Sequence, residues 1–479
     1  MRWCAFLLHT AQKYEKYFHW HLQLRLFLQS TSFSYNLELT TNKLTDMKSI
    51  LFSLILIMIF SEEKSQGLSF QDNFLNSLFP KDPGLVKVRR MNQTEKMTIN
   101  AKVLDFVGMV EQYDYPAEEH NVTTNDGYNL IIHRIPGSPS VDNKVNKEIV
   151  FLLHGILGSS DSWVLYGPEK DLAFLLADRG YDVWIGNVRG NTYCRSHVNM
   201  TTYDRKFWQY SFHEIGTKDL PAMFEYIFRY TDQKDLYYIG HSMGTTSLFV
   251  LLSTKPEYNV KIKMAICLAP VAIWMKTSPV IHELSSIVPI VKKFLAKHKI
   301  YDVIPQSLTT VTLARILCND KVITQSICTT IIFSLTGADP AQLNTTSLPE
   351  VISHCPAGAS VQAFEHYYQN VHTKDFRQYD YGIDENYRRY KRKTPPKYDL
   401  KKITAPIVMF YAENDFFVQE QNVHELSKRL PNVVLTEKVP YKLFNHIDFT
   451  WAIDAKTLLF DRVLELIQKF ETNKNISIK

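Results

Sequence analysis

The feature that most constrains the fold is an alternation of short apolar runs and helical patterns between residues 128 and 268. Ile149–Leu153, for example, is a continuous apolar run, as expected of a strand buried on both faces. Strands that alternate with helices pair in parallel, so the sequence predicts an α/β fold with a mainly parallel central sheet. The predicted strands are Tyr128–Ile135, Ile149–Leu153, Tyr181–Ile185, Leu236–Ile239 and Met264–Leu268, and the predicted helices are Glu169–Arg179, His213–Tyr230 and Met243–Leu252.

The alternation stops near residue 270 and returns with a strand pattern at Ile407–Phe410. Residues 271–398 between these points carry helical apolar stretches without clear strand–helix alternation. We therefore expect a helical insertion at 271–398 between a first core part, 68–270, and a second core part, 399–479. The early part of the insertion is too apolar to lie fully in water, so we interpret it as a cap and lid. A bundle that buries these side chains within itself is the alternative.

A second hydrophobic pattern lies near residue 50. Lys48 precedes the run Ile50–Phe60, which is apolar except for one Ser, and small residues follow at 65 and 67. This arrangement is typical of a signal peptide, and the run is shorter than the ~20 apolar residues that span a bilayer. We interpret 47–67 as a signal peptide and expect no transmembrane segment. Residues 1–46 are then an upstream gene-model extension; a true extension with an internal signal anchor is the alternative.

The charge and the cysteine content bear on the partners of the protein and on its thiols and disulfides. The chain has 54 Lys and Arg against 49 Asp and Glu, a net charge of +5 with no dominant basic block, so no nucleic-acid partner is expected. Past residue 67 the number of Cys is odd, which leaves at least one free thiol in a secreted chain. Cys318 and Cys328 lie ten residues apart, a separation compatible with a local disulfide. The candidate glycosylation sites are Asn92, Asn121, Asn199, Asn344 and Asn475.

The strongest catalytic motif is Gly240-His-Ser242-Met-Gly244. It follows the predicted strand Leu236–Ile239 and opens a predicted helix, which is the context of a nucleophile elbow. The glycines allow strand and helix to approach while Ser242 occupies a strained turn, and the helix N-terminus favours developing negative charge. We therefore predict Ser242 as a nucleophile; a structural Gly/Ser turn is the alternative.

A second loop offers backbone hydrogen-bond donors for an oxyanion. His154-Gly-Ile156-Leu-Gly158 directly follows the predicted strand Ile149–Leu153. In this position the N–H of Ile156 and the N–H of Met243 would together stabilise an oxyanion. The alternative is a glycine-rich turn at the strand exit.

A serine nucleophile needs a base and a carboxylate that orients the base. In α/β-hydrolases, where the nucleophile elbow occurs, both follow the serine in sequence and the acid comes first. Asp415 follows the strand Ile407–Phe410, and Glu413 is the second candidate for the acid. His446 follows a predicted strand at Val433–Val439 and is the predicted base. Asp448 is interpreted as a cap of the following helix.

These motifs resemble the acid lipases of the gastric and lysosomal type, and the similarity runs through most of residues 112–460. The stretches that carry it are Tyr115–Glu119, Val122–Tyr128, His154–Gly155, Gly186–Asn191, Gly240–Gly244, His354–Ser360 and Asn445–Phe449. Two positions depart from the family pattern. Met243 stands where mammalian members carry Gln, and Cys355 stands in a motif that usually lacks Cys.

The resemblance implies an α/β-hydrolase fold with a helical cap and lid, and a Ser242–Asp415–His446 esterase acting on neutral lipid esters at a lipid–water interface. It also implies the oxyanion donors Ile156 and Met243 and a Cys318–Cys328 disulfide. We expect no metal and no cofactor, and a secreted or lysosomal destination. A lipase-like lipid carrier or yolk-type protein is the alternative function. An Asp-nucleophile hydrolase of the same fold is disfavoured by Ser at the elbow.

Overall fold

The computed structural model describes residues 75, 79–80, 83–90, 102–141, 147–320 and 322–476. They belong to one compact unit, Ser61–Lys479. The interpretations of residues 1–46 and 47–67, the sequon at Asn92 and the side chain of Asn475 lie outside the described residues.

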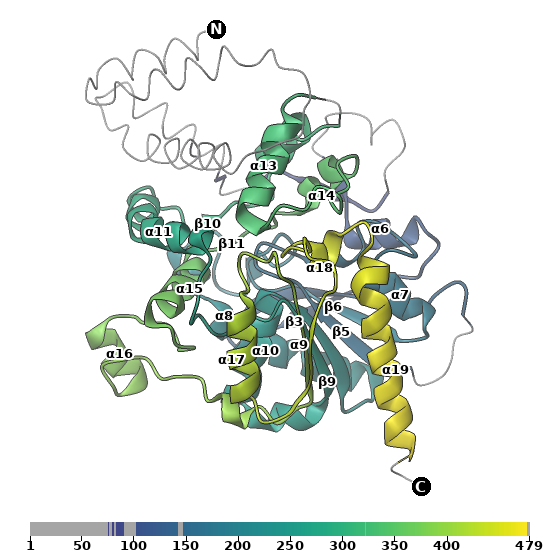
Figure 1. Cartoon of the computed structure of the whole chain (residues 1–479). Helices are drawn as coiled ribbons and strands as arrows, with labels where there is room; N and C mark the ends of the chain where they lie inside the picture. The colour runs from purple at the N-terminus through teal and green to yellow at the C-terminus, as the bar shows by residue number, and fades with distance from the viewer. Residues whose placement is uncertain are drawn as a thin grey trace. The chain divides into compact units, whose positions relative to one another are not determined.

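Within the described residues, a nine-stranded sheet forms the centre of this unit (Figure 1). Neighbouring strands from β6 to β13 run parallel, whereas β3, β4 and β7 add antiparallel pairs. The predicted α/β class with a mainly parallel sheet is confirmed. In sheet order the strands are β13 (Val433–Lys438), β12 (Ile407–Tyr411), β9 (Ile262–Leu268), β8 (Leu236–His241), β5 (Ile149–Leu153), β6 (Asp182–Gly186), β4 (Tyr128–Ile135) and β3 (Glu118–Thr123), with β7 (Ser196–His197) beside β4.

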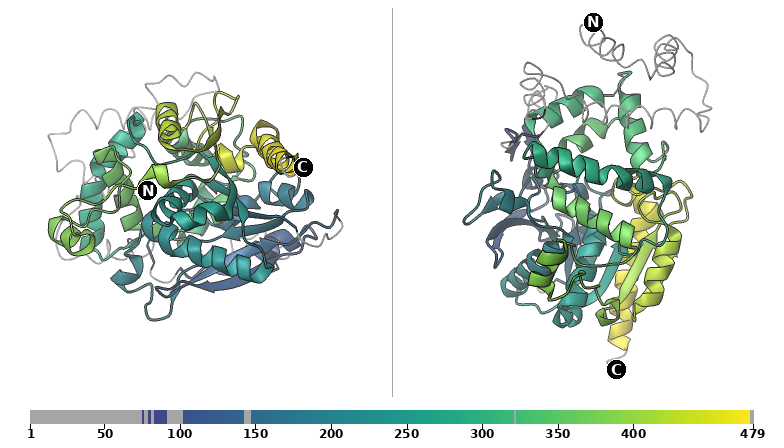
Figure 2. Two further views of the ribbon diagram at one scale, coloured as in Figure 1. Left: turned by 90° about the horizontal axis from the view of Figure 1, so that it is seen from below. Right: turned by 90° about the vertical axis from the view of Figure 1, so that its left-hand side faces the viewer.

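Helices cover both faces of the sheet (Figure 2). Successive residues of a strand point to opposite faces, and two adjacent tyrosines of β8 show which helix covers which face. The Tyr238 ring packs on Phe224 of α9 (Leu220–Thr231), whereas the Tyr237 ring packs on Phe470 of α19 (Asp461–Ile476). Because every residue of β5, β6, β8 and β12 is buried, these strands are apolar almost throughout.

The helix predicted at 213–230 is a continuous helical run with a π turn inside it. Its parts are α8 (Phe212–Glu214), η4 (Ile215–Asp219) and α9. A side chain at Gly216 could not fit, because its Cβ would lie 2.5 Å from the Ser247 carbonyl of α10 (Met243–Thr254). Glycine therefore allows the run to pack closely on the helix that follows the predicted nucleophile. The other helices of the sheet layers are α7 (Leu172–Asp178) and α17 (Glu420–Arg429).

Between β9 and β12 the chain forms mostly helices. In Figure 1, α13 and α14 lie above the sheet, and α11, α15 and α16 lie to its left. The Tyr367 hydroxyl of α15 donates to Thr246 Oγ1 of α10 over 3.0 Å, which fastens this region to the core. The elements are α11 (Pro279–Lys297), β10 (Asp302–Val303), α12 (Leu308–Leu317), α13 (Gln325–Thr336), α14 (Leu348–His354), β11 (Ala359–Ser360), α15 (Val361–Thr373) and α16 (Ile383–Tyr390).

A disulfide joins Cys318, at the end of α12, to Cys328 in α13. The thiols of Cys194, Cys267 and Cys355 are free. Burial raises the pKa of the Cys355 thiol to about 12, so it stays protonated at neutral pH. Within the described ranges, no helix combines the length and apolar character needed to cross a membrane.

Candidate active site

Ser242 lies on a tight turn between β8 and α10. Its φ of +51° lies in the left-handed region, which residues other than glycine rarely adopt. Two glycines make the turn possible, since a Cβ at Gly244 would lie 2.5 Å from the Leu153 carbonyl and one at Gly240 would lie 2.9 Å from the Gly244 carbonyl carbon. The turn presents Ser242 at the N-terminus of α10, as the motif predicts.

Ser242 is hydrogen-bonded to the predicted base, and the base is hydrogen-bonded to the predicted acid. His446 Nε2 lies 2.9 Å from Ser242 Oγ, and His446 Nδ1 lies 2.7 Å from Asp415 Oδ2. All three side chains are buried. Asp415 follows β12, and His446 lies between β13 and α18 (Asp448–Trp451). The fold thus brings together three side chains that are up to 204 residues apart in sequence.

The hydrogen bonds of Asp415 distinguish it from Glu413, the second candidate for the acid. Its Oδ1 accepts from the backbone N–H groups of Phe417 at 2.8 Å and Val418 at 2.9 Å, which fixes the orientation of the carboxylate. Glu413 is half-exposed and pairs with Lys438 Nζ at 3.3 Å. The structure therefore does not bring Glu413 to His446.

Asp448 takes part in capping the following helix, as expected, through a reciprocal pair with Asn445, whose Oδ1 accepts from the Asp448 N–H over 3.2 Å. Asp448 is the first residue of α18 rather than the residue that precedes it, and its Oδ2 accepts from the Asn445 N–H over 2.7 Å. Burial, together with the charge of Asp339, raises the pKa of Asp448 to about 8. The side chain thus shapes the loop that carries His446.

The two predicted oxyanion donors lie on opposite sides of Ser242 in sequence but adjoin it in space. Gly155 precedes Ile156, and a Cβ at Gly155 would lie 3.2 Å from Ser242 Cβ. Met243 is the first residue of α10, where a backbone N–H has no partner within its helix. Within the described part of the chain, no hydrogen-bond partner is found for the N–H of Ile156 or of Met243.

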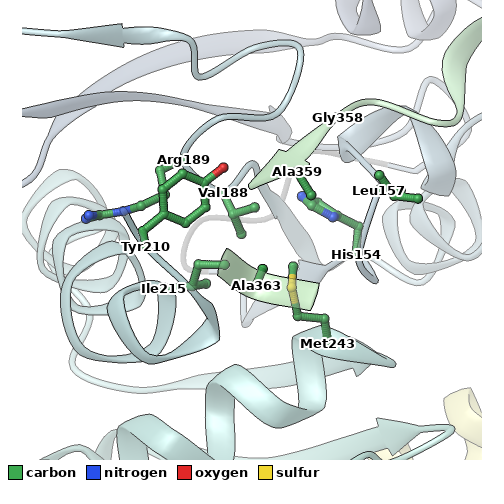
Figure 3. Close-up of a pocket in the computed structure, with 10 residues that line it drawn as sticks. All are labelled: His154, Leu157, Val188, Arg189, Tyr210, Ile215, Met243, Gly358, Ala359 and Ala363. Carbon is green, nitrogen blue, oxygen red and sulfur yellow. The ribbon is translucent and has the colours of Figure 1, made fainter. Parts of the chain in front are cut away.

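A small, mainly apolar cavity adjoins Met243 (Figure 3). It lies between the loop that follows β5 and the first turn of α15, so elements from the sheet region and from 271–398 both line it. Its lining residues are His154, Leu157, Val188, Arg189, Tyr210, Ile215, Met243, Gly358, Ala359 and Ala363.

The sequence analysis missed a role for His241, the residue before the nucleophile. Its Nε2–H donates to the backbone carbonyl of His446 over 3.0 Å, and the two rings lie 5.0 Å apart between centroids. Burial lowers the pKa of His241 well below its usual value, so the ring is neutral. His241 thereby joins the nucleophile turn to the base loop, and only its position inside the motif could have drawn attention to it.

The segment His354–Ser360, recognised in the sequence only by resemblance, meets the core through a buried charge cluster. Asp161 accepts hydrogen bonds from His354 Nδ1 and Lys87 Nζ, each at 2.8 Å, and from the Tyr193 hydroxyl at 2.6 Å. Although burial alone would raise the pKa of Asp161, Lys87 and His354 lower it well below its usual range. The cluster fastens α14 to the chain beside the loop that carries Ile156.

Comparison with known proteins identifies the family to which this fold belongs. The family described as "alpha/beta hydrolase fold" matches residues 148–450, and the "Partial alpha/beta-hydrolase lipase region" matches residues 106–167. The chain is 38% identical to Lipase 3 of Drosophila melanogaster over 370 residues, which are 76% of this chain and 92% of the relative. It is 36% identical to human gastric triacylglycerol lipase over 363 residues, which are 75% and 90% of the two chains.

The fold and the match to residues 148–450 define an α/β-hydrolase. Within that class the similarity to relatives named as lipases extends over nine-tenths of their length. The chain belongs to the acid lipase family, and it is a serine ester hydrolase. Among the residues that the structure describes, no group of three or more His, Cys, Asp or Glu side chains is arranged to hold a metal ion.

Proposed function

We propose that Ser242, His446 and Asp415 form the catalytic triad with which this lipase hydrolyses triacylglycerols or steryl esters. The observation that carries the proposal is the unbroken hydrogen-bond chain from Ser242 Oγ through His446 to Asp415 Oδ2. A serine is a weak nucleophile unless a base removes its proton, and the base acts well only when a carboxylate orients it.

The reaction has two halves that share an acyl-enzyme. Ser242 Oγ attacks the ester carbonyl carbon while His446 Nε2 takes the hydroxyl proton, and His446 then gives that proton to the leaving alcohol as the C–O bond breaks. A water repeats the sequence on the acyl-enzyme and releases the fatty acid. Asp415 remains ionised and stabilises the protonated His446.

Ile156 and Met243 supply the oxyanion hole in this proposal. Negative charge develops on the carbonyl oxygen in both tetrahedral intermediates, and two backbone N–H donors near Ser242 stabilise it. Their availability and the position of Met243 at the N-terminus of α10 support this role. Because the backbone donates, Met in place of the Gln of mammalian members is compatible with it.

The carrier alternative is not favoured by the same geometry. A protein that only stores or transports lipid does not need a nucleophile hydrogen-bonded to a base, yet all three side chains are present and in contact. The relatives are also named as lipases.

In this proposal residues 271–398 form the cap, and α12 and α13 form its lid. Contacts at Tyr367 and Ala357 attach the region next to Ser242, the latter through a hydrogen bond from Ala357 N–H to the Leu157 carbonyl at 2.6 Å. A cap over Ser242 would enclose the acyl chain of a bound substrate and bury its CH₂ groups. Each buried CH₂ contributes about 0.8 kcal/mol, so long acyl chains should be preferred. Equal rates on butyrate and oleate esters would contradict this.

The destination proposed is the secretory route, ending outside the cell or in lysosomes. A disulfide forms and persists in oxidising compartments, which supports this. Of the candidate glycosylation sites, Asn121 and Asn199 are exposed and Asn344 is half-buried, so the first two are the best acceptors. N-terminal sequencing of the secreted protein should begin near Leu68, and a sequence that began at Met1 would refute the route.

The decisive experiment is Ser242→Ala. The variant should fold but lose nearly all turnover, because loss of a triad member typically lowers the rate by several orders of magnitude. A serine-directed phosphonate should label the wild type at Ser242 and leave the variant unlabelled. Retention of more than a few per cent of the wild-type rate would refute the assignment.

A further inference from the structure

Three consecutive backbone carbonyls at the end of α13 contact the loops that carry the acid and the base. The His446 N–H donates to the Thr336 carbonyl over 3.3 Å. The next carbonyl, of Gly337, accepts from Asn445 Nδ2 over 2.9 Å, and the next, of Ala338, accepts from Asn414 Nδ2 over 3.0 Å. Asn414 and Asn445 directly precede Asp415 and His446, so each catalytic residue has a neighbour bound to this segment.

The contact is tight enough to require glycine at its centre. Gly337 has a φ of +112°, and a Cβ there would lie 2.1 Å from the Asn414 carbonyl and 3.0 Å from Asn445 Cβ. No side chain fits between the segment and the two loops. The residue that follows α13 therefore packs directly against Asn414 and Asn445.

The two asparagines also order the loops themselves. Asn414 Nδ2 donates to the Leu443 carbonyl of the base loop over 2.8 Å, which joins the acid loop to the base loop. Asn445 Oδ1 accepts from the N–H of Ile447 over 2.9 Å and from that of Asp448 over 3.2 Å. Asn414 thus joins the two loops, and Asn445 orders the turn that carries His446.

We propose that Thr336–Ala338 is a fixed support that sets the placement of Asp415 relative to His446, with Asn414 and Asn445 as positioning residues. The proposal rests on the proposed triad and adds that residues between β9 and β12 build the site as well as covering it. Only the part of α12–α13 before Thr336 can then move without disturbing the catalytic pair. A shift of about 1 Å at a reacting group lowers the rate by roughly 100-fold, so loss of this support should be visible in kcat.

The test uses Asn414→Ala, Asn445→Ala and Asn445→Asp in the full chain, assayed on a short soluble ester. Rates are expressed per active site titrated with a phosphonate, which removes the effect of unfolded protein. Asn445→Asp keeps the Oδ1 acceptor of the local turn but cannot donate to Gly337. The matched control is Asn432→Ala. Asn432 Nδ2 donates to the Thr404 carbonyl over 2.8 Å, so the variant removes a similar amide-to-carbonyl bond. This bond lies where β12 and β13 begin, at the opposite end of these strands from Asp415 and His446.

We expect kcat to fall about 10- to 100-fold in all three variants, with KM changed less than about threefold, and the control to stay within about twofold of wild type. The proposal is overturned if kcat per titrated site is unchanged, or if Asn445→Asp restores the wild-type rate, which would limit Asn445 to its local turn. Ser242→Ala is run alongside, because its retained activity would refute the triad rather than the support.

Discussion

The central sheet and the α12–α13 region place their apolar side chains very differently. Every residue of β5 and β8 is buried. In contrast, Ile323 between α12 and α13 is 92% exposed, Ile327 of α13 is 53% exposed and Leu317 of α12 is 47% exposed. The sheet thus buries its apolar side chains within the protein, whereas α12–α13 exposes apolar side chains to water, which is unfavourable in free energy.

The sheet contributes to stability by burying its apolar side chains, whereas α12–α13 leaves apolar side chains available for contact with another partner. Apolar burial in the sheet contributes to the free energy of folding, and its loss should be felt as instability. The exposed side chains of α12–α13 contribute little to folding, and under the proposed function they contribute when the protein meets a lipid surface. Variants in the two regions should therefore affect different measurements.

Replacement of the proposed acid, which follows β12 of the sheet, should remove most of the activity. Asp415→Asn should lower kcat on any ester by about 10⁴-fold, because it removes the charge that orients and stabilises His446. Glu413→Gln is the matched control at the same loop and should change kcat less than about threefold. The reverse ranking, measured by initial rates on a soluble ester, would show that Glu413 is the acid.

The next effect compares stability between the two regions. Ile266→Ala in β9 removes a fully buried side chain and should lower the free energy of unfolding by about 2–5 kcal/mol. Ile323→Ala should change it by no more than about 0.5 kcal/mol. Denaturant titrations of both variants measure this, and similar losses would mean that α12–α13 is as important for folding as the sheet.

The disulfide joins α12 to α13, so its removal tests whether the α12–α13 region contributes to the stability of the protein. Replacing Cys318 and Cys328 together by Ser should lower the free energy of unfolding by at most about 3 kcal/mol, the loop-closure value for this ten-residue separation. Thermal unfolding followed by circular dichroism measures the loss. If the midpoint did not move, the α12–α13 link would be irrelevant to the cooperative unit.

The smallest effect concerns the lipid surface. The double variant Ile323→Ser with Ile327→Ser should lower the rate on an emulsified long-chain ester about tenfold and leave the rate on a soluble short ester unchanged. Val260→Ser is the matched control, since Val260 is 84% exposed on the sheet layers. Equal rates for the variants and wild type on the emulsion would leave the apolar surface without a role in catalysis.

Sequence patterns predict the fold best where burial is complete on both faces. Ile149–Leu153 and Ile407–Phe410 are continuous apolar runs, and both are strands at almost those bounds. Helix limits were less predictable. The helix expected from residue 169 begins at Leu172, because the buried Asp171 before it binds the N–H groups of Tyr166 and Gly167.

The candidate site divides in the same way. Ser242, Asp415 and His446 could be predicted because each follows a strand, and parallel strands bring their ends to one edge of a sheet. The contacts of His241 with His446, and of Thr336–Ala338 with Asn414, could not be predicted. They join segments about 80 to 200 residues apart through backbone carbonyls, and a carbonyl leaves no pattern in a sequence.

The pairing of β12 with β9 bears on how the protein is made. The two strands are neighbours in the sheet but about 140 residues apart in the chain. At a synthesis rate of about 5–20 residues per second, the edge of β9 waits on the order of 10 s for its partner. An unpaired apolar edge is a template for wrong pairing between chains. We therefore expect the growing chain to be more prone to aggregate while α11 to α16 are being synthesised than after β12 has paired with β9.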